Sequence, residues 1–376
     1  MKVLFSYLNR QFGTDKSTLN GKWHYTDRIF TALHDFVKTG DFTLGKKLQE
    51  FEEKFARFIG VQHAIGVNSG TDALILSLKA LGIGHGDEVI TSAETFIATA
   101  GAIAAVGARP VFVDVNDEFE IDAEKIESAI TPKTKAIIPV WFTGNAPQMD
   151  TIVETAKKHD LPLIEDSCCA IDASYKGKKA GAWGITGTFS FHPLKNLNVW
   201  SDGGIVTTHS DDIAKKVRLL RNHGLVSRDE VELCGINSRL DTLQAVVALQ
   251  MFDDVSDLTN KRIEIAKQYD DAFCRIPSIN IPPRHPDVRH VFHLYMIRVQ
   301  KRDELLQYCT ENGVEAKVHY PIPLPYQKCF TSCGYKKGDF LATEQDNASI
   351  ISLPCHAYLT DEEVGYVIEV VTKFYA

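Results

Sequence analysis

Between residues 64 and 208 the sequence alternates short apolar runs with segments of helical periodicity, and this alternation restricts the folds open to the chain. The apolar runs predict strands at residues 64–67, 88–91, 110–114, 136–140, 162–165, 187–191 and 204–208. The intervening segments predict helices at residues 72–81, 97–106, 123–130 and 149–158. Strands that are apolar almost throughout are typical of a sheet covered on both faces. The pattern therefore predicts an α/β fold with a mostly parallel mixed sheet between helices.

The sequence after residue 208 follows a different pattern. Helices are predicted at residues 211–222 and 238–273, followed by a proline-rich stretch at 276–283. The remaining chain predicts a smaller α+β unit, with strands at 291–299 and 314–319 and a helix at 303–312. We therefore expect an N-terminal arm and helix (residues 1–45), a large domain (46–275) and a small C-terminal domain (276–376).

Charge and cysteine content exclude several classes of protein. The 41 basic and 49 acidic residues give a net charge of −8, which argues against a protein that binds the backbone of nucleic acid. No apolar run reaches about 18 residues, so no membrane span is predicted. The eight cysteines include a C-x3-C pair without a second pair. We therefore expect reduced thiols in a cytoplasmic protein and no metal site.

Three groups of unusual residues follow predicted strands of this sheet. Asn68-Ser69-Gly70-Thr71 opens a helix, so it predicts either a phosphate-binding turn or an ordinary helix cap. Asp166 ends another strand and could hold a protonated ring nitrogen or cap the next segment. Lys195 follows Pro193 on a loop with aromatic neighbours, and is either a Schiff-base nucleophile or a solvated surface lysine.

The order of these three groups favours a functional interpretation over three separate structural ones. An enzyme that uses pyridoxal 5′-phosphate (PLP) needs a phosphate anchor, an acid for the pyridine nitrogen and a lysine for the Schiff base. All three occur at ends of strands in one predicted sheet, which is where open α/β sheets bind ligands. The sequence therefore predicts PLP as the cofactor.

From about Gly40 to the C-terminus the chain resembles the DegT/StrS family of PLP-dependent sugar aminotransferases, which have the fold-type-I transferase fold. The stretches that carry the resemblance include Gly40-Asp41-Phe42-Thr43-Leu44-Gly45, Asn68-Ser69-Gly70-Thr71-Asp72, Gly86-Asp87-Glu88-Val89-Ile90, Glu165-Asp166, Phe189-Ser190-Phe191-His192-Pro193-Leu194-Lys195, Arg221-Asn222-His223-Gly224 and Val318-His319-Tyr320-Pro321.

The resemblance implies a role for individual residues. Lys195 would form the Schiff base and move the proton between substrate and cofactor, and Asp166 would keep the pyridine nitrogen protonated. Gly70, Thr71 and Ser190 would hold the phosphate, and Phe96 would stack on the ring. Asn237 would reach the cofactor of a neighbouring subunit, because family members are homodimers with shared active sites. His319 and Tyr320 would line the substrate cleft, and Arg239 is a candidate for the donor carboxylate.

Three stretches depart from the family pattern, one of which is Leu324-Pro325-Tyr326, where the family commonly has Pro-Leu-His. Cys169 replaces the usual His or Gln three residues after the aspartate, which puts the cofactor contact at that position in question. The segment at residues 12–18 has no family counterpart, and its sequence fits an arm, a substrate loop or a disordered stretch.

The resemblance implies transfer of an amino group from glutamate or glutamine to a keto-sugar that is nucleotide-linked, phosphorylated or free. The residues around Lys195 and Asp202-Gly203-Gly204 favour amination at C3 of the sugar. One alternative is a PLP-dependent sugar dehydratase, although dehydratases of this fold carry His at the lysine position. The other is a non-catalytic regulator on the same fold, which would not need an intact set of cofactor contacts.

Overall fold

The computed structural model describes residues 1–13 and 22–376, so most of the segment at 12–18 lies outside the described residues. Its central sheet consists of two hydrogen-bonded groups of strands, in the orders β3-β2-β4 and β5-β8-β9-β1. Parallel bridges from Ile137 to Leu163 and from Val140 to Asp166 join β4 to β5. The strands are β1 (His63–Val67), β2 (Glu88–Ser92), β3 (Arg109–Val113), β4 (Thr134–Ile138), β5 (Ile164–Asp166), β8 (Thr186–Ser190) and β9 (Gly204–Thr208).

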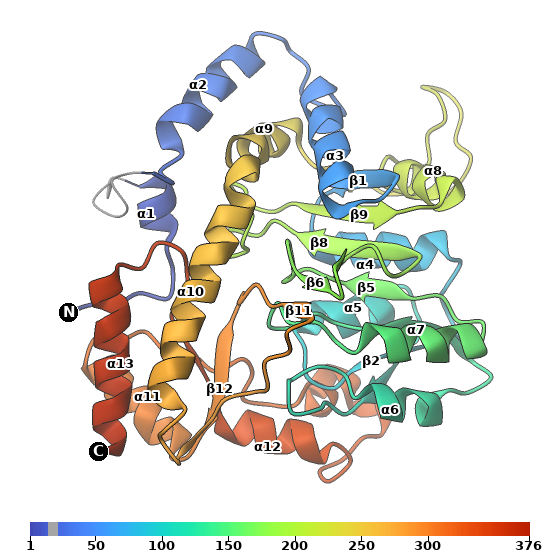
Figure 1. Cartoon of the computed structure of the whole chain (residues 1–376). Coiled ribbons are helices and arrows are strands. Elements are labelled where there is room, and N and C mark those ends of the chain that lie inside the picture. The colour runs from blue at the N-terminus through green and yellow to red at the C-terminus, as the bar shows by residue number, and fades with distance from the viewer. Residues whose placement is uncertain (14–21) are drawn as a thin grey trace.

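The sheet is mostly parallel, with β9 antiparallel to both of its neighbours, β8 and β1. Successive side chains of a strand point to opposite faces of the sheet, and a different layer of helices covers each face. Val89 of β2 packs with α4 (Gly70–Ala80) and α5 (Ile97–Ala105), whereas Ile90 packs with α6 (Ala123–Ile126) and α7 (Met149–Lys158). Figure 1 shows the sheet between these layers. The predicted α/β fold, with a mixed sheet sandwiched by helices, is confirmed.

Further helices cover the β1 end of the sheet. On the layer of α4, α8 (Asp211–Leu220) packs against β1 and β9. On the other layer, α3 (Lys46–Ile59) packs against β1 and α9 (Thr242–Met251), and α9 in turn contacts α2 (Thr26–Val37). The aromatic core of this layer includes Phe51, Phe55, Phe189 and Phe191, so it lies directly beneath the loop that carries Lys195.

The single helix predicted at residues 238–273 is wrong. The chain instead forms α9, a 3₁₀ turn at Phe252–Asp254 and α10 (Val255–Phe273). The first residues of the predicted helix are extended because their backbone bonds to other segments. Ser238 donates its N–H to the Arg221 carbonyl at 2.9 Å, and its own carbonyl accepts from Asn68 N–H at 3.1 Å.

The C-terminal unit contains the antiparallel sheet β10 (Ile279–Asn280), β12 (Tyr295–Val299) and β13 (Ile350–Leu353). Its helices are α11 (Arg302–Glu311), α12 (Leu341–Ser349) and α13 (Asp361–Tyr375). The strand predicted at 314–319 is wrong, because Val314 bridges to Val3 and Lys317 bridges to Ser352 without a continuous ladder. Small strands β6 (Ser174–Tyr175), β7 (Lys178–Lys179) and β11 (Val288–Arg289) form a separate sheet.

The core of the C-terminal unit draws on residues from outside it. Tyr269 and Phe273 of α10 pack into this core, and so does Val3 near the N-terminus. In Figure 1, the N-terminus lies beside this unit, which includes the C-terminus, and α1 (Leu8–Phe12) lies between α2 and α13. The division at residues 45 and 275 stays a prediction.

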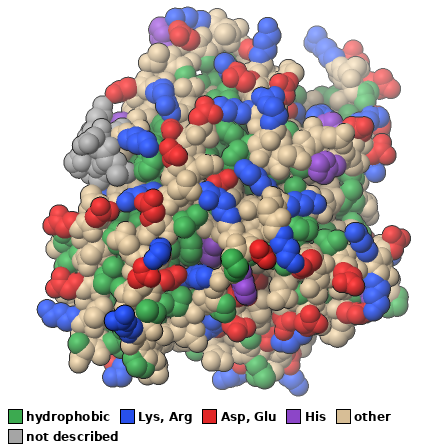
Figure 2. Space-filling view, in the orientation of Figure 1, with side chains coloured by type: hydrophobic (Ala, Val, Ile, Leu, Met, Phe, Trp, Pro, Cys, Tyr) green, Lys and Arg blue, Asp and Glu red, His purple; other side chains and the backbone are tan. Residues whose placement is uncertain are grey.

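The surface carries no obvious single-sign region on the face in Figure 2, where basic and acidic side chains are intermixed. Within the described residues, none of the helices is both long enough and apolar enough to cross a bilayer.

Candidate active site

Asp166 lies at the carboxyl end of β5, where its carboxylate is held by two neighbouring elements. The Thr99 hydroxyl, from the first turn of α5, donates to Oδ2 at 2.7 Å, and Cys168 N–H donates to Oδ1 at 3.2 Å. The side chain is only 5% exposed. A buried carboxylate with fixed donors and a remaining acceptor position is suited to binding a cationic N–H group.

Glu165 shows how differently the preceding carboxylate is used. Because successive side chains of a strand point to opposite faces, Glu165 faces away from Asp166. It accepts N–H donors from Gly181 at 2.9 Å, Trp183 at 2.6 Å and Gly184 at 2.8 Å. Burial raises its pKa to about 7 despite these three donors. Glu165 therefore fixes a loop, whereas Asp166 faces the edge where the other candidate residues gather.

The N-terminus of α4 lies next to two of these candidates. Ser69 caps the helix by accepting the Asp72 N–H at 3.1 Å. A Cβ atom placed on Gly70 would come within 2.7 Å of Cys168 Sγ and 2.8 Å of Ser190 Cβ. The N-terminus of α4, with its free N–H groups, therefore packs directly against the end of β8, and only glycine fits at this position. Such a terminus binds anions.

Lys195 lies on the loop between β8 and β9 and points toward Cys169. Its Nζ donates to Cys169 Sγ at 3.0 Å, and Cys169 lies three residues after Asp166. Burial by itself would lower the pKa of the Lys195 ammonium, but interaction with Cys169 and Cys168 raises it above its usual value. Burial in turn raises the pKa of the Cys169 thiol. The strand ends thus bring the predicted acid, phosphate anchor and lysine together.

The C-terminal unit contributes aromatic residues to the same region. The Tyr320 ring lies 6.0 Å from that of Phe96 and 6.0 Å from that of Phe142. Burial and the nearby Cys169 raise the pKa of Tyr320 to about 12, and Lys195 acts in the opposite direction. His319 bonds through Nδ1 to Ser352 Oγ at 2.9 Å, and burial lowers its pKa to about 4. Phe96 stays 51% exposed.

Asn237 and Arg239 flank Ser238, whose carbonyl accepts from Asn68 N–H at 3.1 Å beside the N-terminus of α4. Asn237 is exposed and bridges to Asn222, and Arg239 donates to Asn222 Oδ1 at 2.7 Å. Among the contacts of the described residues, none joins either side chain to Lys195. Their predicted roles therefore depend on a substrate or on a second copy of the chain.

Sequence reasoning did not identify His293, whose Nδ1 is buried without a hydrogen-bond partner among the described residues. Burial, and then Lys195, lower its pKa well below the usual value. Its neighbourhood is tight, since a Cβ on Gly144 would come within 3.0 Å of His293 N and 3.1 Å of Cys169 O. A histidine after an apolar segment has no local signal that places it next to a lysine nearly a hundred residues away.

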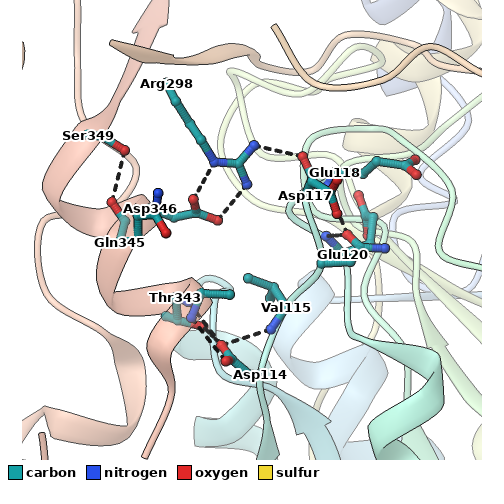
Figure 3. Close-up of polar contacts among 12 residues, drawn as sticks. Asp114, Val115, Asp117, Glu118, Glu120, Arg298, Thr343, Gln345, Asp346 and Ser349 are labelled. Atoms are coloured by element: carbon teal, nitrogen blue, oxygen red, sulfur yellow. Dashed lines mark hydrogen bonds and ion pairs between the residues drawn. The ribbon is translucent and has the colours of Figure 1, made fainter. Parts of the chain in front are cut away.

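A buried group of acids lies where the C-terminal unit meets the sheet (Figure 3). Asp114, after β3, accepts Thr343 N–H at 2.9 Å and Ala342 N–H at 3.1 Å, and so holds the start of α12. Arg298 of β12 donates from Nη2 to Asp346 at 2.9 Å and from Nη1 to the Asp117 carbonyl at 2.7 Å. These contacts attach the unit that carries Tyr320.

Two acids in this neighbourhood, Glu94 and Glu120, have buried carboxyl oxygens without a hydrogen-bond partner among the described residues. Burial raises both of their pKa values well above the usual range, with Asp346 adding to the rise for Glu94 and Glu118 for Glu120. Within the described residues, no group of three or more His, Cys, Asp or Glu side chains is arranged to hold a metal ion.

Known proteins share this arrangement of the chain. The chain is 41% identical over 350 residues to the "Pleiotropic regulatory protein" of Geobacillus stearothermophilus, covering 92% of this chain and 94% of that protein. It is 36% identical to the dTDP-3-amino-3,4,6-trideoxy-alpha-D-glucose transaminase of Streptomyces venezuelae, covering 91% of each. The structure of NtdA from Bacillus subtilis with bound PMP matches with a TM-score of 0.91 and 32% identity, covering 99% of this chain and 85% of that one.

The family model supports the same relationship over nearly the whole chain. Residues 24–372 match it, and they include the candidate residues of the strand ends and of the C-terminal unit. The chain belongs to the DegT/DnrJ/EryC1/StrS aminotransferase family.

Proposed function

We propose that the protein is a PLP-dependent sugar aminotransferase that moves an amino group from glutamate or glutamine to a keto-sugar. The observation that carries the proposal is the convergence of Lys195, Asp166 and the α4 N-terminus at one edge of the sheet. Lys195 Nζ lies 3.0 Å from Cys169 Sγ in the turn after Asp166, and Gly70 packs against Cys168 of that turn and against Ser190 at the end of β8. Family membership supports the reaction class.

The residues present fit PLP in charge and in shape. Gly70 and Thr71, at the start of α4, and Ser190 offer N–H and hydroxyl donors to a phosphate, and the glycine lets the start of α4 lie against Cys168 and Ser190. Asp166, already fixed by Thr99 and Cys168, would hold the protonated ring nitrogen. When bound, the cofactor supplies an electron sink for negative charge at the substrate carbon. Phe96 is exposed beside Tyr320, so its ring face is open to stacking.

Lys195 would attach the cofactor and then hold and move the proton at the substrate carbon. The amine must be neutral to attack a carbonyl, whereas Cys169 and Cys168 raise the pKa of Lys195 above its usual value against the effect of burial, so the ammonium has to give up a proton before it attacks. Cys169 Sγ lies close enough to accept a hydrogen bond from Nζ and so orients the amine toward the turn that carries Asp166. Lys195 also separates this assignment from a sugar dehydratase, because a side chain without an amine could not perform the attachment.

The sugar would bind between the strand ends and the C-terminal unit, with His319 and Tyr320 on one side. We propose amination at C3, since the names of two relatives specify that position, the Streptomyces venezuelae transaminase and a 38% identical 3-aminotransferase from Acidithiobacillus ferrooxidans. Arg239 is the proposed partner for the donor carboxylate. The names of these relatives specify nucleotide-linked sugars. The experiment described below therefore compares nucleotide-linked, phosphorylated and free sugars.

We further propose a homodimer in which Asn237 serves the partner's cofactor. Asn237 is exposed and follows the exposed Ile236, and the same segment exposes Val231; the two apolar residues are 39% and 58% accessible. Light scattering should give about twice the chain mass of 41.9 kDa. A monomer that transaminates at full rate would exclude the shared site.

The test of function is a pair of half-reactions followed by the absorption of the bound cofactor. Glutamate, or glutamine, should convert the enzyme to its amino form, and 3-keto-sugars in nucleotide-linked, phosphorylated and free forms are then added one at a time. Return of the original spectrum with a 3-keto-sugar, and not with its 4-keto isomer, is the expected result. Failure with every keto-sugar would favour the regulator that the name of the Geobacillus relative suggests.

A further inference from the structure

Residues 3–12, which no predicted motif explains, lie between the loop of Lys195 and the C-terminal unit. We call this segment the N-terminal strap. It runs from Val3, which packs in the core of the C-terminal unit, to α1. The strap therefore contacts both parts of the molecule that form the candidate active site.

On one side the strap bonds to the backbone and side chains of the lysine loop. The Tyr7 hydroxyl donates to the carbonyl oxygen of Lys195 at 2.8 Å. Gln11 and Asn198 exchange two amide hydrogen bonds, at 2.9 and 2.8 Å, and Asn198 also donates to the Pro193 carbonyl. Gln11 is 2% exposed and Asn198 is 0% exposed, so water does not compete for these groups.

On the other side the strap is held by the C-terminal unit. Val3 N–H donates to the Gly313 carbonyl at 2.8 Å, and the Val3 carbonyl accepts from Glu315 N–H at 2.9 Å. His356 Nε2 bonds to the Leu4 carbonyl at 3.1 Å. Arg10 pairs with both carboxylate oxygens of Glu363, at 2.7 and 2.6 Å.

The two sets of contacts meet at Tyr7. Its ring stacks on Tyr358 of the C-terminal unit, with centroids 5.3 Å apart and planes 8° apart. Its hydroxyl, at the other end of the ring, reaches Lys195. Among the described residues, Tyr7 is the donor that satisfies the Lys195 carbonyl. A displacement of the C-terminal unit would therefore be transmitted to the backbone of Lys195 through one rigid side chain.

We propose that the strap is a positioning element of the active site, with Tyr7 and Gln11 fixing the lysine loop relative to the unit that carries His319 and Tyr320. Pro193 prevents the lysine loop from forming a regular helix with its own backbone hydrogen bonds. The conformation of the loop therefore depends on contacts with other segments of the chain. When a reacting group is displaced by about 1 Å, the reaction that it takes part in becomes much slower. The inference rests on the proposed role of Lys195, and its test separates the two.

The matched test compares Tyr7→Phe with Tyr358→Phe. Both rings are buried in the same stack, and each hydroxyl donates to one backbone carbonyl, that of Lys195 for Tyr7 and that of Trp23 for Tyr358. Tyr7→Phe is expected to slow the glutamate half-reaction about tenfold at saturating donor, and Tyr358→Phe about twofold or less. The two variants should have similar unfolding midpoints, since each loses one buried hydrogen bond.

A second readout needs no cofactor. Amide hydrogen exchange of residues 192–200, measured by mass spectrometry on the cofactor-free protein, should be faster in Tyr7→Phe than in Tyr358→Phe. Gln11→Met, which keeps the side-chain volume and removes the amide pair, should reproduce both effects if Tyr7→Phe does not fold. Equal rates and equal exchange in all variants would overturn the proposal. Borohydride trapping on Lys195 in the same variants shows whether only the strap, or the lysine assignment itself, has failed.

Discussion

The two sides of Lys195 are built in different ways. On the cofactor side, Asp166, Cys169 and Ser190 lie at or just after strand ends, and the partners that fix them come from the same sheet or its covering helices. On the strap side, Tyr7 and Gln11 lie 188 and 187 residues from their partners in the lysine loop. The first arrangement follows from the topology of an α/β sheet. The second forms only when the N-terminus and the C-terminal unit close on the sheet.

The largest effect is expected from Asp166→Asn. Loss of the negative charge removes a charge-assisted hydrogen bond to the ring nitrogen, which is worth about 2–3 kcal/mol, or about a hundredfold in rate. Stopped-flow absorbance of the glutamate half-reaction measures this loss. The cofactor-side account would be wrong if the variant reacted at the parent rate.

Glu165→Gln is the matched control for Asp166→Asn. The same strand carries both carboxyls, but Glu165 bonds to backbone N–H groups on the other face. Its substitution should lower the free energy of unfolding by about 1–3 kcal/mol and leave the half-reaction within about threefold of the parent. Urea unfolding and the same stopped-flow assay give the two numbers. Equal kinetic losses in both variants would mean that Asp166 acts through folding alone.

Gly70→Ala tests the shape of the phosphate site. The added Cβ would lie 2.7 Å from Cys168 Sγ and 2.8 Å from Ser190 Cβ, so α4 or the end of β8 must shift. We expect the dissociation constant for PLP to rise at least about tenfold in a fluorescence titration of the cofactor-free protein, a loss of about 1.4 kcal/mol. Gly365→Ala, in α13, meets nothing within 4 Å and should leave this constant unchanged. The same affinity in both variants would remove Gly70 from the site.

The smallest effect concerns the strap side and depends on pH. Burial, and then Arg262, lower the pKa of His356 to about 3 in the folded protein, below the value of about 6.5 in an unfolded chain. The unfolded chain therefore binds a proton at this histidine more tightly than the folded protein does. As a result, the free energy of unfolding decreases as pH falls from 6.5 toward 3. His356→Gln should reduce the pH slope of the unfolding free energy by up to about 1.4 kcal/mol per unit. Parallel slopes in urea unfolding at pH 7, 6 and 5 would contradict this.

The contrast between the two sides also explains how far the sequence could predict the molecule. Regular alternation located the strands of the sheet to within a few residues, because burial on both faces imposes apolar runs. The ends of those strands then gave Asp166, Gly70 and Lys195 as candidates, and the structure places them at one edge. The local sequence pattern was sufficient to predict residues that come together through the order of the strands in the sheet.

Local pattern failed where partners are remote. The segment at 238–241 has helical periodicity, but Ser238 bonds to Arg221 and Asn68 instead. The sequence at 314–319 is typical of a strand, but Val314 bridges to Val3 and Lys317 bridges to Ser352, so no continuous ladder forms. Tyr7, His293 and Glu94 carry no sequence signal for their positions, because each depends on the packing of units that are far apart in the chain.

Borohydride reduction of the PLP-loaded protein, followed by peptide mapping, tests whether Lys195 forms the Schiff base with the cofactor. The reduced cofactor is expected on the peptide containing Lys195. None is expected on a folded Lys195→Ala variant, whose glutamate half-reaction should be slower by at least about a thousandfold. Recovery of the cofactor on a different lysine, or a Lys195→Ala variant that reacts at the parent rate, would contradict this assignment.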